Sequence, residues 1–276
     1  MIMDQKLDCC GLFDSHAHYF DKKFEAEGGA DAFLRDEVFG KGVAAVVNVA
    51  TNPENAKLCL EQAKNYPAMY VALGIHPEDA QHLTTSVDEA LSELCSLMDT
   101  PEKRKEGKII ALGEIGLDYY WQPYDKELQA ELFEKQLSLA EQWDLPVLIH
   151  DREAHGDCFE TVLRHPHVRG VFHSFSGSAE MAKELVRRGW YISFSGVLTF
   201  KNARKVREAA AVVPNERILI ETDAPYLSPE PFRGKLNHSG RMAQTANALA
   251  EILGLSYAET VAMTAENARR LFGFTE

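Results

Sequence analysis

Two histidines separated by a single residue, His16 and His18, follow an apolar run near the start of the chain. In an extended chain, residues two positions apart point to the same side, so both imidazoles can reach one metal ion. A His-x-His pair by itself is weak evidence, because two polar residues in a turn after a strand give the same pattern. The pair therefore needs support from other parts of the chain.

Four more side chains of metal-binding type stand where other apolar runs end, namely Glu114, His150, His173 and Asp223. Each of them alone could be a core histidine or an exposed carboxylate. In a parallel barrel, however, the carboxyl ends of all strands lie on one rim, where active sites are built. Imidazole and carboxylate are ligands that zinc, manganese and related divalent ions prefer. Together with His16 and His18, these residues predict a metal site with six ligands.

Six ligands exceed the three protein ligands of one catalytic zinc ion, so the sequence predicts two divalent ions, such as Zn²⁺, Mn²⁺ or Mg²⁺. A carboxylate can bridge two ions, and Glu114 is the best placed bridge. We assign one ion to His16, His18, Glu114 and Asp223, and the other to Glu114, His150 and His173.

Glu114 and Asp223 are the predicted catalytic residues. Asp223 would orient the attacking water and accept its proton. The alternative is that Asp223 caps a helix that starts at Ala224-Pro225, since aspartate and proline are also typical of a helix start.

Short apolar runs that alternate with amphipathic stretches must position these residues, and this alternation is typical of parallel βα units. We predict strands near residues 12–16, 43–49, 69–74, 109–114, 146–150, 170–173, 191–195 and 218–222. Helical stretches include residues 55–65, 126–143 and 179–188, whereas the charged stretch 101–108 is predicted to be a solvated loop.

Eight such units favour an α/β fold of the TIM type, a (β/α)₈ barrel that forms one domain over residues 1–276. Barrels of roughly 250 residues commonly form a single domain. A doubly wound open sheet is the alternative, although no glycine-rich dinucleotide fingerprint follows the first predicted strand.

The formal net charge of −13 argues against a protein whose whole surface coats duplex nucleic acid. None of the five cysteines is in a C-x-x-C arrangement, so we expect neither a disulfide framework nor a zinc knuckle. The start of the sequence has no secretory signal pattern, and no apolar run approaches the roughly 18 residues of a membrane span. We therefore expect a cytoplasmic protein that does not bind membranes and has no obligate protein partner.

Eight motifs, in order along nearly the whole chain, resemble those of the TatD family of metal-dependent deoxyribonucleases, among the amidohydrolase-like barrels. They are FDSHAH at 13–18, LGIHP at 73–77, GEIGLDY at 113–119, PVLIHDR at 146–152, HSFSGS at 173–178, SFSGVLTFKN at 193–202, ETDAPYL at 221–227 and ENARRLFG at 266–273. The resemblance implies a TIM-type barrel, divalent metals on the six residues named above, and hydrolysis of phosphodiester bonds in DNA. It also suggests a 3′–5′ exonuclease that takes a strand end or a single strand, with His76 in contact with the substrate.

A DNA substrate would need cations and flat rings on the rim, and base stacking on an aromatic ring is worth roughly 1–3 kcal/mol. Arg152 and Arg233 are the main candidates for substrate binding. Further candidates are Lys201, Arg204, Lys235, Tyr119, Tyr120, Trp121, Phe175 and Tyr226, although most of these rings are expected to serve in packing. Two departures from the family pattern, at Glu78 and at Asn237, His238 and Ser239, are predicted to lie on the same rim and to affect substrate preference.

Two other functions stay open on the residues alone. The first is hydrolysis of a small amide, ester or lactone on the same metal core. The second is a catalytically silent binding protein, which the complete ligand set disfavours. Activity screening with added divalent metals would separate these alternatives from a nuclease.

Overall fold

The eight strands of the sheet are parallel, and each is hydrogen-bonded to the next in chain order. The computed structural model describes residues 7–273. The strands are β1 (Phe13–Ala17), β2 (Ala45–Val49), β3 (Met69–Leu73), β4 (Ile109–Asp118), β5 (Val147–Arg152), β6 (Gly170–Phe172), β7 (Tyr191–Phe194) and β8 (Ile218–Ile220). A sequential strand order without a reversal excludes the doubly wound open sheet.

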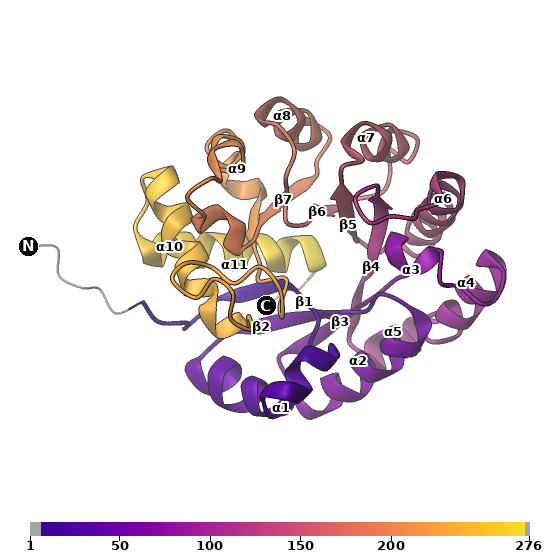
Figure 1. Ribbon diagram of the computed structural model, residues 1–276, viewed down its shortest axis with the longest axis horizontal. Helices are drawn as coiled ribbons and strands as arrows, with labels where there is room; N and C mark the ends of the chain where they lie inside the picture. Colours follow the sequence, from indigo (N-terminus) through magenta and orange to yellow (C-terminus); the bar gives the residue numbers. More distant parts are fainter. Residues whose placement is uncertain (1–6, 274–276) are drawn as a thin grey trace, which may run out of the picture.

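The sheet closes where the end of β1 meets the chain that follows β8. Ala17 pairs with Ala224, and the His18 amide donates to the Ala224 carbonyl at 2.6 Å. The Asp223 amide donates to the His16 carbonyl at 2.9 Å. The result is a nearly closed barrel surrounded by helices (Figure 1), which confirms the predicted TIM-type fold.

Most helices form the outer layer around the strands (Figure 1). They are α1 (Ala30–Ala32), α2 (Pro53–Asn65), α3 (Pro77–Ala80), α4 (Val87–Ser96), α5 (Pro101–Glu106), α6 (Lys126–Trp143), α7 (His155–Leu163), α8 (Ala179–Arg187), α9 (Arg204–Ala210), α10 (Met242–Leu253) and α11 (Tyr257–Phe272). Shorter 3₁₀ and π turns are η1 (Lys22–Glu27), η2 (Phe33–Val38), η3 (Phe39–Lys41), η4 (Gly196–Thr199), η5 (Asn215–Arg217) and η6 (Ser239–Arg241). None of the helices in the described part of the chain is long and apolar enough to cross a membrane.

Local sequence signals explain where several helices begin. Asn52 caps α2 by accepting from the Asn55 amide, and Pro53 occupies the first turn, where its missing N–H has no partner to lose. Ser256 and Glu259 form a reciprocal capping box at the start of α11. These caps satisfy amides that a helix leaves unpaired and fix where each crossover starts.

The prediction of a solvated loop at residues 101–108 was wrong, because this charged stretch contains helix α5. Thr100 caps the helix by accepting from the Lys103 amide at 3.2 Å, and Pro101 stands in its first turn. Most of its side chains are exposed, as expected for charged residues. Thr100 and Pro101 are typical of a helix start, and this local signal determines the secondary structure here more than the charge of the residues that follow.

Apolar side chains form two clusters, separated by the alternation of strand residues. One cluster lies between the strands and the surrounding helices and includes Val46 and Leu73. The other joins the opposite face of the strands, including Val47 and Leu148, to α11. In the second cluster the rings of Phe13 and Phe272 stack with centroids 6.0 Å apart. The barrel is therefore packed with side chains on both faces of its strands, as a parallel sheet requires.

Candidate metal centre

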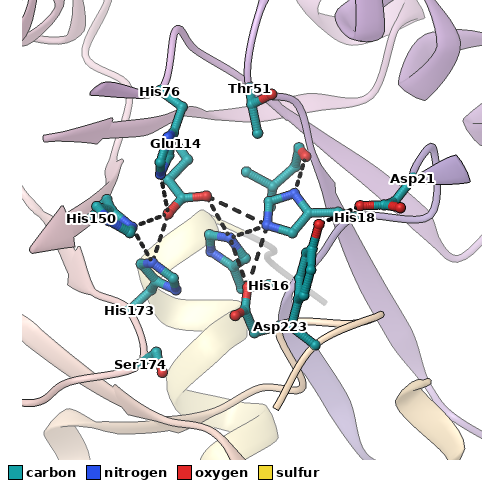
Figure 2. A network of polar contacts seen from close by, with 12 residues as sticks. His16, His18, Asp21, Thr51, His76, Glu114, His150, His173, Ser174 and Asp223 are labelled. Atoms are coloured by element: carbon teal, nitrogen blue, oxygen red, sulfur yellow. Dashed lines mark hydrogen bonds and ion pairs between the residues drawn. The ribbon is translucent and has the colours of Figure 1, made fainter. Parts of the chain in front are cut away.

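The six predicted metal ligands lie in five strands or within three residues after them. His16 is in β1 and His18 follows it, Glu114 is in β4, and His150 is in β5. His173 comes directly after β6, and Asp223 follows β8. All six side chains point toward one centre at the carboxyl end of the barrel (Figure 2).

One oxygen of Glu114 faces the histidines of β1. Glu114 Oε2 lies 3.1 Å from His16 Nε2 and 3.5 Å from His18 Nε2. The Asp223 carboxylate completes this group, with Oδ1 at 3.3 Å from His18 Nε2 and 4.0 Å from His16 Nε2. These four residues are the set that the sequence assigned to one ion.

The other oxygen of Glu114 faces the histidines of the neighbouring strands. Glu114 Oε1 lies 2.6 Å from His150 Nδ1, 2.7 Å from His173 Nε2 and 3.5 Å from His76 Nε2. Figure 2 shows the carboxylate between the two groups, with one oxygen turned to each. A carboxylate that bridges two ions must be oriented in this way.

Three of the four candidate imidazole ligands also have the outer contact that metal ligands need, because an acceptor on the far nitrogen fixes which nitrogen carries the proton, whereas Nδ1 of His16 is buried without a hydrogen-bond partner. His18 Nδ1 donates to the Val49 carbonyl at 2.7 Å, which leaves the lone pair of the neutral ring on Nε2. His150 Nε2 lies 2.9 Å from Asp118 Oδ2, and His173 Nδ1 lies 3.2 Å from Glu221 Oε1. The residues therefore fit divalent metal binding.

Strong coupling between buried charges shifts the pKa values of this cluster. Burial opposes ionisation of Glu114, but His173, His76 and His16 hold the pKa of its carboxyl well below the usual range. Burial likewise opposes protonation of His150, yet Asp118 and Glu114 raise its pKa to about 9. Burial and the neighbouring His173 lower the pKa of His16, so this ring is neutral at pH 7. Because its pKa is raised, His150 carries a proton at neutral pH, and a bound metal ion would displace this proton.

The family model described as TatD related DNase matches residues 13–273 of the sequence. This chain belongs to the TatD family. Its sequence is 41% identical over 277 residues to the uncharacterized metal-dependent hydrolase YcfH of Escherichia coli K12, with 95% of each chain covered. It is 36% identical over 268 residues to the uncharacterized metal-dependent hydrolase YabD of Bacillus subtilis, which covers 95% of this chain and 98% of the relative.

The fold of this TatD family member is also similar to solved structures. The crystal structure of YjjV, a TatD homologue from Escherichia coli K12, superposes with a TM-score of 0.86 and 31% identity, and the match covers 97% of this chain and 100% of that one. The chain is therefore a metal-dependent hydrolase on a TIM barrel.

Three buried carboxylates that support the centre were not among the predicted site residues. Asp118 and Glu221 are in contact with the ligand rings of His150 and His173. Asp14 accepts from the Thr222 amide at 3.0 Å and thus ties β1 to the chain just before Asp223. The signal for Asp14 and Asp118 was an even spacing from His16 and Glu114 in the same strand, which places side chains on one face.

A cavity of about 690 Å³ opens at the centre, and the predicted substrate contacts are divided between it and its surroundings. His76 and Arg152 line it, as do the rings of Trp121, Phe175 and Tyr226. Arg233 lies outside this cavity, with its guanidinium 4.2 Å above the ring of Phe200. The other rim candidates, Lys201, Arg204, Lys235, Tyr119 and Tyr120, are not part of the cavity wall.

The structure separates the two departures from the family pattern. Glu78 lines the cavity, in agreement with the prediction. The prediction that Asn237, His238 and Ser239 lie on the substrate rim was wrong, because all three are buried. Asn237 donates to the Thr222 carbonyl at 3.0 Å, and Ser239 Oγ donates to Asp14 at 2.7 Å. Asn237 and Ser239 thus support the chain next to Asp223, and none of the three residues lines the cavity.

Asp223 does not cap a helix, since the described residues after it form turns up to η6. Its backbone has a φ of 57°, in the left-handed region, which aspartate tolerates better than most residues. This conformation, with the Asp223 amide bonded to the His16 carbonyl, turns the carboxylate toward His18.

Proposed function

We propose that this TatD-family hydrolase is a deoxyribonuclease that binds two divalent ions and cleaves phosphodiester bonds at the end of a DNA strand. The observation that supports it best is the orientation of Glu114, whose two oxygens face two separate groups of imidazoles. The description of the family as TatD related DNase supports DNA as the substrate class. A cavity of about 690 Å³ is of small-molecule size, which suits a strand end better than a duplex.

Bound divalent ions would supply hydroxide at neutral pH by lowering the pKa of water, and would neutralise charge on the attacked phosphate. In this proposal His16, His18, Glu114 and Asp223 hold one ion, and Glu114, His150 and His173 hold the other. Asp223 accepts the proton of the attacking water. The pairing with His18 outweighs burial and lowers the pKa of Asp223, so the carboxylate is ionised at neutral pH and can accept a proton.

His76 is better suited to hold the substrate than to bind metal. Its Nδ1 accepts a hydrogen bond from the Glu78 amide at 3.1 Å, so Nδ1 carries the lone pair and Nε2 carries the proton of the neutral ring. Nε2 points toward the centre, 3.5 Å from Glu114 Oε1. His76 can therefore donate to a phosphate oxygen at the reacting group, and Arg152 in the same cavity wall offers a second donor, which is cationic.

The test is hydrolysis of single- and double-stranded DNA, labelled at either end, by protein loaded with Mn²⁺, Mg²⁺ or Zn²⁺. We expect metal-dependent release of nucleotides from a strand end, and loss of this activity in Asp223→Asn. Turnover of ester, amide or lactone substrates without hydrolysis of DNA would contradict the proposal and favour the acyl hydrolase. Inactivity on both substrate classes would favour a binding protein.

A further inference from the structure

A second hollow of about 580 Å³ lies beside the metal cavity. Lys23, Tyr226 and Leu227 line both, so the two spaces are adjacent. The walls of the second hollow come from η1, from Phe200 after η4, and from the loop that follows β8. We call it the side hollow.

The side hollow is lined by three exposed cations, Lys23, Arg233 and Lys235, and by one acidic residue, Glu27. Among the ion pairs of the described residues, none involves these three cations. The three cations line one hollow together with a single carboxylate, and this concentration of positive charge suits an anionic ligand.

The metal cavity has the opposite balance. Its wall contains seven carboxylates, Asp21, Glu78, Asp79, Glu114, Asp118, Asp151 and Asp223, against the cations Lys23 and Arg152. A DNA strand can enter this space only where metal ions offset the negative charge. The phosphates next along the strand would be repelled by the remaining carboxylates, so they need a different path.

Two aromatic rings of the side hollow each have a cation over one face. The Lys23 ammonium lies 3.8 Å from the centre of the Tyr226 ring, and the Arg233 guanidinium lies 4.2 Å from the centre of the Phe200 ring. Tyr226 is 40% exposed and stands at the junction of the two spaces. Cations beside aromatic rings in a groove are the combination that binds single strands without reading their sequence.

We propose that the side hollow is a second subsite, which binds the phosphates of the single strand beyond the nucleotide held at the metal centre. Arg233 and Lys235 contact these phosphates, and Tyr226 stacks on a base where the strand passes from one space to the other. The subsite rests on the proposed function. It requires that the enzyme prefer strands of several nucleotides to a dinucleotide, whose single phosphodiester is the bond at the metal centre.

The test compares steady-state hydrolysis of a dinucleotide and of longer oligothymidylates by the metal-loaded protein. In the wild type, KM should fall as the strand lengthens. In the double variant Arg233→Gln, Lys235→Gln, KM for long strands should rise roughly tenfold with little change in kcat, and KM for the dinucleotide should not change. The dependence of binding on salt should also become shallower, by about 0.7 in the logarithmic slope for each phosphate contact that is lost.

The matched control is Lys183→Gln, Arg187→Gln on α8, which removes the same charge from the outer layer of the barrel. This control should behave as the wild type. Should the double variant leave the length dependence intact, or raise KM equally for the dinucleotide and the long strands, the side hollow is not a subsite.

A separate measurement distinguishes failure of the subsite from failure of the proposed function. The metal-loaded protein is titrated into a fluorescent ten-nucleotide oligothymidylate, and anisotropy reports binding whether or not the strand is cleaved. Binding that weakens in the Arg233, Lys235 variant and not in the control supports the subsite even for a protein without nuclease activity. Equal binding by both variants overturns it, and so does an absence of binding.

Discussion

The carboxylate of Asp118 lies 2.9 Å from Nε2 of His150, on the edge of the ring turned away from Glu114. Its other oxygen accepts from the amides of Tyr120 at 2.8 Å and Trp121 at 3.2 Å. Asp118 therefore connects a metal-facing imidazole to the turn that carries Trp121 in the cavity wall. This connection exists because β4 continues four residues past Glu114 and pairs Asp118 with Arg152.

Replacing Asp118 by asparagine should weaken metal binding in the half of the centre formed by His150 and His173. The amide has no charge to hold the ring and favour its basicity, and outer-shell changes of this kind cost roughly 10–100-fold in metal affinity or activity. Metal titration of the apoprotein measures the effect. Asp99→Asn, at an exposed carboxylate paired with Lys103, is the control that should keep wild-type affinity. If both variants bound metal with equal affinity, the role of Asp118 would be limited to its hydrogen bonds with the amides of Tyr120 and Trp121.

Replacing Glu114 by glutamine should disturb metal content more than the loss of any single histidine, for example in His18→Ala. Glutamine is nearly the same size but carries no charge, so two dications close together would lose the anion they share and repel each other. At least one ion should then bind far more weakly, and hydrolysis should fall to near background. Mass spectrometric metal analysis beside the rate measurement checks this. Two ions per chain with near wild-type turnover would make Glu114 a structural carboxylate.

Removal of the metals by EDTA should abolish hydrolysis and leave the fold largely intact. The barrel has an apolar core on both faces of its strands that does not involve the metal ligands. Circular dichroism before and after chelation should therefore change little, and activity should return when metal is added back. A broad loss of secondary structure on chelation would show that the ions hold the barrel together.

His238 should make stability depend on pH below neutrality. Burial, with Arg241 nearby, lowers the pKa of this ring to about 4, from about 6.5 in the unfolded chain. The unfolded state therefore binds more protons between these values, and stability falls as pH drops through that window. From pH 7 to pH 5 the loss attributable to this ring is about 2 kcal/mol.

The measurement for His238 is urea unfolding of wild type and His238→Gln at both pH values, with the metals bound. The difference in the free energy of unfolding between the two proteins gives the contribution of His238 alone, because groups with the opposite pH dependence are present in both. One of these is Asp14, whose pKa burial raises to about 6, so that its contribution to stability falls as pH rises. An identical pH dependence in the two proteins would show that His238 is not held in its neutral form.

The clustering of the six candidate ligands could be predicted from the sequence because each one stands at or near the end of an apolar run. His16, Glu114 and His150 required only the rule that parallel strands end on one rim. Their division into two groups around the oxygens of Glu114 also agrees with the geometry. The apolar strand runs, and the points where they end, therefore predict the site as well as the fold.

The parts that could not be predicted depend on contacts between segments far apart in the chain. Whether Asn237 faces the substrate or the interior depends on Thr222, to which it donates, and no spacing reveals this partner. Arg233 matched the expected residue type for DNA binding, but its place outside the metal cavity follows from the course of the loop after β8. The charged residues of α5 hid a helix start that Thr100 and Pro101 signal.

The contacts between β1 and the chain around β8 that close the barrel have a consequence for synthesis of the protein. Asp14 and Thr222 are 208 residues apart in sequence, yet their hydrogen bond joins the strand of His16 to the residue before Asp223. During translation, the first histidines leave the ribosome long before the carboxylate that completes their group. A growing chain therefore carries a partial centre, and the centre becomes complete only when β8 docks against β1. Hydrolysis therefore requires that β8 has been synthesised and that the barrel has closed.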